Sequence, residues 1–147
     1  MPDTQDQVTR IAAYGLMIDA DQILLCRISD QLPQDSGSWT LPGGGLEFGE
    51  DPASAMVREV HEETGLVVEV AGLAGVDSLV IEREGTGFHS IRILYLARIL
   101  GGKLTCEVDG TTDLCEWHHI RDVQSLPVVD LVHRALALLP IPPDPQA

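Results

Sequence analysis

The chain has 147 residues, of which 44% are hydrophobic and 22% charged. This length matches one domain with a continuous buried core, and the composition is typical of a globular protein rather than a disordered or fibrous one. Acidic residues outnumber basic ones 23 to 9, which gives a net charge of −14, and no two basic residues are adjacent. Such a surface repels phosphate backbones and anionic lipid, so we expect neither duplex nucleic acid nor a membrane as a partner.

The cysteines and the apolar runs indicate the compartment. Cys26, Cys106 and Cys115 have no CxxC spacing, which predicts neither a disulfide framework nor a zinc site; we expect small core residues in a reducing compartment. The N-terminus lacks the basic and apolar segments of a signal peptide, and the most apolar run, residues 91–100, is interrupted by two arginines. We therefore expect a cytoplasmic protein.

The first half of the chain reads as strands and loops. Apolar runs at residues 9–18 and 23–27 flank an Asp-containing turn, which predicts two strands. Residues 29–38 are rich in Ser, Asp, Gly and Pro and predict a loop. Residues 39–51 contain too many glycines for a helix. Three of these glycines are consecutive, which indicates a backbone that approaches a ligand or another strand closely.

A helical pattern starts at Pro52, which suits a first helical turn, and Gly65 is expected to end it. Beyond it the pattern predicts strands at 66–84 and 88–100 joined as a hairpin, a strand at 114–120 and a helix at 128–139. Helices mixed with strands in this order predict an α/β or α+β fold with a mixed sheet. We expect one domain over residues 1–140 and a Pro-rich, disordered tail over 141–147.

The predicted helix concentrates like charge on one face. On a helical wheel, the core-facing stripe consists of Ala53, Met56, Val57, Val60 and Thr64. Beyond one edge of this stripe follow Glu63, Glu59 and Glu62. Carboxylates at the edge of a core are partly desolvated and repel one another, so a proton or a cation must balance them. Mg²⁺ and Mn²⁺ prefer such oxygen ligands.

Arg58 lies four residues before Glu62 and points to nearly the same side of the helix. It can hold a carboxylate in a fixed orientation, as the surroundings of metal sites commonly require. The alternative is an exposed ion pair of small energetic value on an ordinary acidic helix.

The spacing around this helix resembles a known family motif. Gly44, five residues, Glu50, seven residues and then REVHEETGL (58–66) resemble the Nudix box, G-x5-E-x7-R-E-U-x-E-E-x-G-U with U aliphatic, and every defined position is filled. The resemblance implies an α/β/α sandwich with a central mixed β-sheet and a loop-helix-loop catalytic box. It also implies water attack on the pyrophosphate of a nucleoside diphosphate linked to another group, with Mg²⁺ or Mn²⁺ as cofactor.

The resemblance also implies roles for the motif residues. Glu62 and Glu63 match the main metal ligands, and Glu59 would bind metal or position and deprotonate the attacking water. Of the remaining positions, the Gly44 carbonyl would be a further ligand, Glu50 would support the site, and Arg58 would orient the glutamates.

Many family members use one more acid, after the central strands, as a ligand or base. The candidates here are Glu107, Asp109, Asp113 and Glu116, of which we favour Asp113 and Glu107. The alternative for each of them is that it is an ordinary acidic residue of a loop, with no role in the site.

Substrate signatures are mostly absent. Residues 80–84 (VIERE) contain neither the Pro frequent in ADP-ribose-type enzymes nor the Tyr of diadenosine-polyphosphate types, and the coenzyme A pattern is incomplete. Elimination favours a nucleoside triphosphate, normal or oxidised. The alternatives are an ADP-ribose or nucleotide-sugar pyrophosphatase, an isoprenoid diphosphate isomerase and a non-catalytic nucleotide-sensing module. The resemblance also makes a homodimer reasonable.

Overall fold

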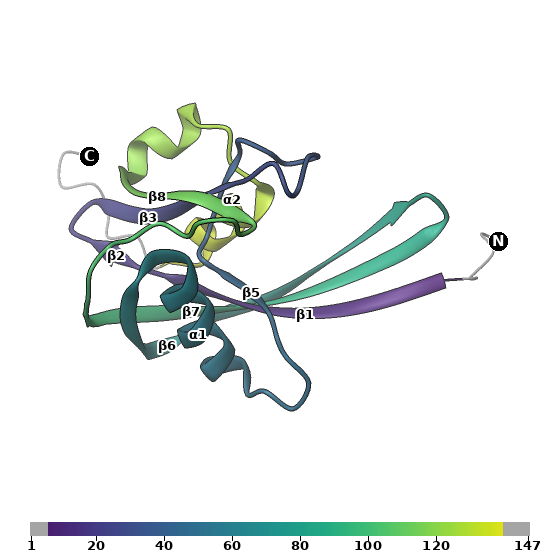
Figure 1. The fold of residues 1–147 in the computed structure, drawn as a ribbon, viewed down its shortest axis with the longest axis horizontal. Helices are drawn as coiled ribbons and strands as arrows, with labels where there is room; N and C mark the ends of the chain where they lie inside the picture. Colours follow the sequence, from purple (N-terminus) through teal and green to yellow (C-terminus); the bar gives the residue numbers. More distant parts are fainter. Residues whose placement is uncertain (1–5, 140–147) are drawn as a thin grey trace.

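Two β-sheets form the framework of the protein, which a computed structural model describes over residues 6–139 (Figure 1). In chain order the elements are β1 (Asp6–Leu16), β2 (Ile18–Asp19), β3 (Gln22–Ile28), β4 (Trp39–Thr40), β5 (Gly43–Gly45), α1 (Pro52–Thr64), β6 (Leu66–Arg83), β7 (Thr86–Gly102), β8 (Thr112–His119), the 3-10 helix η1 (Ile120–Ser125) and α2 (Asp130–Leu138). One sheet has the order β5-β1-β7-β6; the other has β2-β3-β4, with β8 also paired to β3.

The first sheet is mixed, because β1 runs parallel to β7 while its pairing with β5 and the β6–β7 pairing are antiparallel. Successive strand residues point to opposite faces, so β1 contributes to two separate cores. Ala13 packs with Met56 and Val60 of α1, whereas Leu16 packs with Val132 and other residues of α2 and the second sheet. The predicted α/β/α sandwich with a central mixed sheet is therefore confirmed.

Most predicted elements are present, with shifted ends. The glycine-rich stretch contains the short strands β4 and β5, and the predicted helix at 128–139 begins only at Asp130, after η1. The predicted tail, 141–147, lies outside the described residues. No helix within residues 6–139 combines the length and apolarity needed to cross a bilayer.

The buried stripe of α1 differs from the wheel. Ala55 and Glu63 are buried, while Ala53 and Val57, which we expected in the core, are half-buried. The cause is β5: glycines carry no side chains, so this strand lies close to the helix and covers its Glu63 side. Of the cysteines expected in the core, Cys26 and Cys115 are buried but Cys106 is only half-buried.

The distal parts of β6 and β7 form a long hairpin that extends with β1 away from the helices (Figure 1). Its turn lies at Glu84 and Gly85, which both have positive φ (51° and 81°). Near the tip, the Arg83 guanidinium donates a hydrogen bond to the Gln34 side chain. The hairpin therefore reaches the 29–38 loop, which is a loop as predicted.

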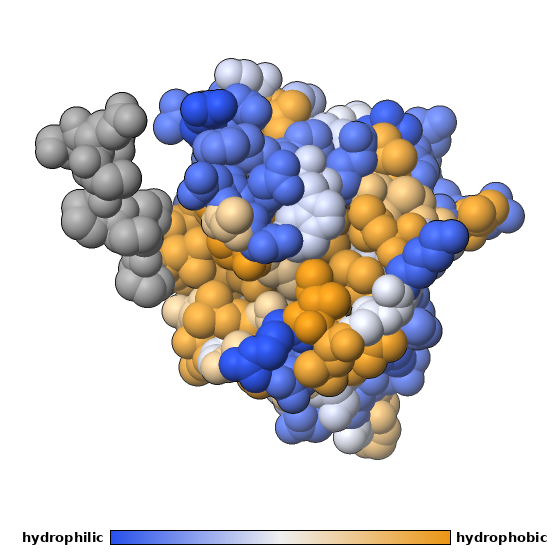
Figure 2. All heavy atoms as spheres, turned by 90° about the vertical axis from the view of Figure 1, so that its left-hand side faces the viewer, coloured by the Kyte–Doolittle hydropathy of each residue, from blue (hydrophilic) through white to orange (hydrophobic). Residues whose placement is uncertain are grey.

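Hydrophobic side chains gather at the opposite end, where β2 lies (Figure 2). A hollow there is lined by Met17, Ile18, Asp19, Ala71, Ala97, Arg98 and Ile99. The register of β6 against β7 shifts three times over this part of the hairpin. Val67, Val70 and Leu73 are exposed along this part of β6.

Candidate active site

Both ends of α1 are fixed by residues that suit helix termini. The Asp51 side chain accepts hydrogen bonds from the N–H groups of Ala53 (3.1 Å) and Ser54 (3.4 Å), and Pro52 occupies the first turn. Gly65 ends the helix with a φ of 75°, and a Cβ at this position would also clash with the Lys103 carbonyl. With both ends fixed, α1 directs its carboxylates toward β5.

The glycine strand lies directly against those carboxylates. A Cβ on Gly44 would lie 2.7 Å from the carboxyl carbon of Glu59, so no larger residue fits without displacing it. The Gly43 N–H donates to Glu63 Oε1 at 2.9 Å. The close backbone approach predicted from the three glycines is thus present, both to β1 and to the helix.

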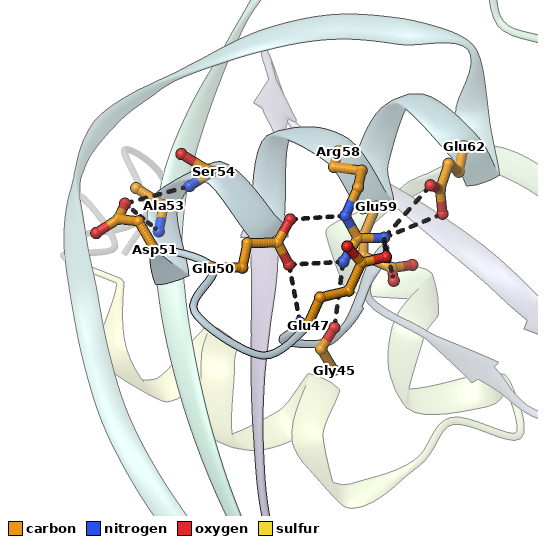
Figure 3. Close-up of polar contacts among 9 residues, drawn as sticks. All are labelled: Gly45, Glu47, Glu50, Asp51, Ala53, Ser54, Arg58, Glu59 and Glu62. Carbon is orange, nitrogen blue, oxygen red and sulfur yellow. Dashed lines mark hydrogen bonds and ion pairs between the residues drawn. The ribbon is translucent and has the colours of Figure 1, made fainter.

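Arg58 is the centre of an ion-pair network (Figure 3). Its Nε and Nη2 donate to the two Glu50 carboxylate oxygens at 2.7 and 2.8 Å. Its Nη1 reaches Glu59 at 3.0 Å and Glu62 at 3.3 Å, and its Nη2 reaches the Gly45 carbonyl at 3.3 Å. Arg58 therefore ties the loop residue Glu50 and two helix glutamates to the glycine strand.

This network sets the charge state of Glu50. The hydrogen bonds from Arg58, followed by one from the Glu47 N–H, lower the pKa of the Glu50 carboxyl to about 2. In return, the hydrogen bonds to Glu50 raise the pKa of Arg58 above its ordinary value. Both groups are fully charged at neutral pH, so Glu50 is a permanent anchor for the guanidinium.

Glu63 has the opposite environment. The residue is 4% exposed, and its second carboxylate oxygen accepts a hydrogen bond from the Thr112 hydroxyl at 3.2 Å. Neither this donor nor the Gly43 N–H carries a charge. The pKa of Glu63 is raised to about 8: burial is the main cause, the charges of Glu59 and Glu107 add to the rise, and the two hydrogen bonds oppose it.

The structure separates the two favoured extra acids. Glu107 is half-buried, and its pKa is raised first by burial and then by the charges of Glu59 and Glu62, so it lies near the cluster. Asp113 instead forms an ion pair with Arg27 at 2.9 Å. Thr112 points toward Glu63, whereas Asp113 is the exposed, unpaired residue of the β3–β8 bulge and is engaged by Arg27, which places it outside the cluster.

Sequence reasoning missed Thr112 and Arg10. Thr112 carries no motif signal, since its role depends on the register of β8. The Arg10 guanidinium lies 3.2 Å from where a Gly45 Cβ would be, and it forms no ion pair within residues 6–139. It also opposes the burial that raises the pKa of Tyr14. The sequence held no signal for Arg10 either, because its place beside the glycine strand depends on the pairing of β1 with β5.

The donors suit a hard cation that shares its coordination with a ligand. Among the described residues, no three Asp, Glu, His or Cys side chains converge closely enough to hold a metal ion by themselves. Mg²⁺ usually takes only one or two carboxylates and completes its shell with water and substrate phosphates. Glu59 and Glu63, which meet the glycine strand from α1, provide such a partial set of oxygens, so the residues fit a divalent cation.

Comparisons with known proteins agree with this geometry. The family model for the NUDIX domain matches residues 8–143. An ADP-ribose pyrophosphatase from Methanocaldococcus jannaschii is 37% identical over 94 residues, which cover 64% of this chain and 53% of that protein. The 8-oxo-dGDP phosphatase NUDT18 from Mus musculus is 36% identical over 95 residues, covering 65% of this chain and 27% of that protein. The chain thus spans about half, or less, of these relatives.

A solved structure shares the whole fold. The MutT NUDIX hydrolase from Burkholderia pseudomallei superposes with a TM-score of 0.75 at 23% identity, covering 90% of this chain and 98% of that one. At this identity the likeness concerns the fold alone.

Proposed function

Since the chain belongs to the NUDIX family, we propose that it is a pyrophosphohydrolase that uses Mg²⁺ or Mn²⁺ to cleave a nucleoside diphosphate linked to another group. The observation that carries the proposal is the buried Glu63 beside Glu59 and the glycine strand, a carboxylate cluster that has no basic partner at Glu63 among residues 6–139. A divalent cation resolves that charge and also offsets the repulsion between an acidic protein and an acidic substrate.

The proposed roles follow the motif positions. Glu62 and Glu63, with Glu59 and the Gly44 carbonyl, hold the cation, which when bound neutralises phosphate charge and lowers the pKa of a water molecule. Glu59 lies against Gly44 and is the candidate to position and deprotonate the attacking water. Because phosphoryl transfer needs little covalent chemistry from the protein, positioning and charge supply most of the catalysis.

Arg58 and Glu50 hold the glutamates in place. Their two parallel hydrogen bonds fix the guanidinium plane, and the remaining N–H groups then set the orientation of Glu59 and Glu62. Glu107 is the favoured extra ligand or base, because it lies near Glu59 and Glu62, whereas Asp113 is engaged by Arg27.

The substrate we favour is a nucleoside triphosphate, normal or oxidised. Arg10 supports this choice, since its guanidinium lies next to the glycine strand and has no carboxylate partner within residues 6–139. A triphosphate brings a third phosphate that such a cation binds, and ADP-ribose does not. ADP-ribose is the second candidate, because the relative from M. jannaschii carries the name ADP-ribose pyrophosphatase.

A substrate panel tests the proposal. The purified chain, with Mg²⁺ or Mn²⁺, is incubated with normal and oxidised nucleoside triphosphates, ADP-ribose and nucleotide sugars, beside a Glu63→Gln control. We expect a triphosphate to give a nucleoside monophosphate and pyrophosphate, and the control to give neither. Nucleotide binding without cleavage of any compound would instead favour a non-catalytic sensing module.

A further inference from the structure

Two of the three cysteines touch each other beside the carboxylate cluster. Cys106 Sγ and Cys115 Sγ are 3.0 Å apart, and the Cys115 N–H also donates a hydrogen bond to Cys106 Sγ at 3.1 Å. Cys106 is half-buried, while Cys115 is buried. The third thiol, Cys26, is 0% exposed and pairs with Cys115 across the β3–β8 ladder. The spacing of the cysteines in the sequence had not predicted the contact between Cys106 and Cys115.

The segment between these two cysteines carries residues of the candidate active site. Glu107 directly follows Cys106 and lies near enough to Glu59 and Glu62 for their charges to raise its pKa. Thr112, three residues before Cys115, donates its hydroxyl to Glu63. The thiol pair therefore joins the loop that carries Glu107 to the strand β8, which carries Thr112, and a change in the distance between the sulfurs acts on that loop.

We propose that Cys106 and Cys115 are an oxidative modification site, at which a hydroperoxide such as hydrogen peroxide closes a reversible disulfide bond. Cys106 is the thiol that reacts first. It is the more exposed of the two, and its sulfur is the acceptor for both the N–H and the S–H of Cys115. Exposure and hydrogen bonds to sulfur both favour nucleophilic attack by that sulfur.

The chemistry balances with one peroxide per disulfide. The Cys106 sulfur attacks one peroxide oxygen, the O–O bond breaks, and the leaving hydroxide takes the thiol proton as water, which leaves a sulfenic acid. The Cys115 sulfur then attacks Cys106 Sγ, the S–O bond breaks, and the hydroxide leaves with the Cys115 proton as a second water. Two thiols are oxidised and one peroxide is reduced. A thiol reductant reverses the bond by exchange.

Closing the bond moves the loop. A disulfide is about 2 Å long, so the two sulfurs must approach each other by about 1 Å from their present separation. Cys115 is held in the β8 strand, so the shift falls mainly on Cys106 and on the adjacent Glu107. We expect the shift to displace Glu107 from the cluster and to lower turnover; this consequence rests on the proposed function, whereas the disulfide does not.

Tryptic peptides of the peroxide-treated chain test the modification directly. Cleavage at Lys103 and Arg121 releases residues 104–121, which contain both Cys106 and Cys115, while Cys26 lies in the separate peptide 11–27. After treatment and alkylation of free thiols, we expect peptide 104–121 to be unalkylated and lighter by two hydrogens, and peptide 11–27 to be alkylated. Dithiothreitol should restore two alkylation sites in peptide 104–121.

Three results would overturn the proposal: a cross-link between the two peptides, a disulfide-linked dimer, or a sulfinic acid on Cys106 without a disulfide. Cys106→Ser and Cys115→Ser should each abolish the mass change. Cys26→Ser is the matched control and should keep it. If Cys115→Ser folds poorly, Cys106→Ser alone still decides the result, because its side chain is half-buried.

Turnover on the best substrate tests the consequence for the site. Peroxide should lower the kcat of the wild type and of Cys26→Ser several-fold, with recovery after dithiothreitol, and leave Cys106→Ser unchanged. A disulfide that forms without any change in kcat would disprove the effect on Glu107. A reduced chain that cleaves no substrate would disprove the proposed function. The peptide masses would still show whether the disulfide forms.

Discussion

The two sides of the carboxylate cluster differ in how their negative charge is balanced. Glu50, with its side chain 15% exposed, receives two hydrogen bonds from Arg58, and its pKa falls to about 2. Glu63, 4% exposed, receives only an N–H and a hydroxyl, and its pKa rises to about 8. Uncharged donors do not offset burial beside other carboxylates, whereas a guanidinium does. Within residues 6–139, the protein supplies a cation to Glu50 but none to Glu63.

The largest expected effect is on the side without a cation. Glu63→Gln keeps the size and most hydrogen bonds of the side chain but removes its charge, so we expect kcat to fall by about a hundredfold or more with the fold intact. Steady-state kinetics measures kcat, and circular dichroism shows whether the fold is intact. Near-normal activity in both Glu63→Gln and Glu62→Gln would refute the assigned metal ligands.

Metal-free stability should depend on pH because of the same side chain. The pKa of Glu63 is raised from 4.5 to about 8 on folding, so the folded chain holds a proton that the unfolded chain has lost in this interval. The associated stability is complete below pH 4.5 and is lost as pH rises through 8, a loss of a few kcal/mol. Urea unfolding at several pH values should show the fall in the wild type.

The matched variant for this experiment is Glu63→Gln, which cannot titrate. Its unfolding free energy should lack the wild-type fall between pH 4.5 and 8, and added Mg²⁺ should reduce the fall in the wild type. Parallel pH profiles for the two proteins would show that Glu63 is not the buried titrating group.

Arg58 gives an intermediate effect, because it acts through the glutamates that it holds. Arg58→Lys keeps the charge but cannot make both parallel hydrogen bonds to Glu50, so we expect a loss in metal affinity or kcat of about tenfold. The dependence of the initial rate on Mn²⁺ concentration separates a loss of metal affinity from a loss of kcat. Arg98→Lys, at an exposed ion pair with Glu69, is the control and should behave as the wild type. Equal behaviour of both variants would mean that the network of Arg58 is merely a surface feature.

Arg10 should give the smallest effect, limited to binding. Arg10→Gln removes the cation near Gly45, which has no carboxylate partner among the described residues, so we expect the KM for a triphosphate to rise several-fold while kcat stays constant. The KM for ADP-ribose, which has no third phosphate, should not change. A change in KM of equal size for both substrates would argue against a contact between Arg10 and that phosphate.

The sequence determines the helix side of the site better than the strand side. Pro52, Gly65 and the spacing from Gly44 to Glu63 are local signals, because capping, positive φ and helical periodicity depend on neighbouring residues. They correctly predicted α1, its end and the approach of the glycines.

The strand side depends on register, which no local pattern specifies. The β3–β8 ladder shifts between Arg27 and Ile28, and this bulge decides that Thr112 rather than Asp113 faces Glu63. Asp113 and Glu107 therefore looked equivalent in the sequence. The buried Ala55 was missed for a related reason, since the contact of α1 with β5 is also tertiary. The cytoplasmic location and the homodimer stay predictions.

The most direct test of a cation at Glu63 is a Mn²⁺ titration followed by electron paramagnetic resonance, since bound Mn²⁺ loses the signal of the free ion. Wild type and Asp113→Asn, whose carboxyl points away from the cluster, should bind Mn²⁺ with the same affinity, and Glu63→Gln should bind it at least about tenfold more weakly. Equal Mn²⁺ affinity in Glu63→Gln and wild type would contradict the account.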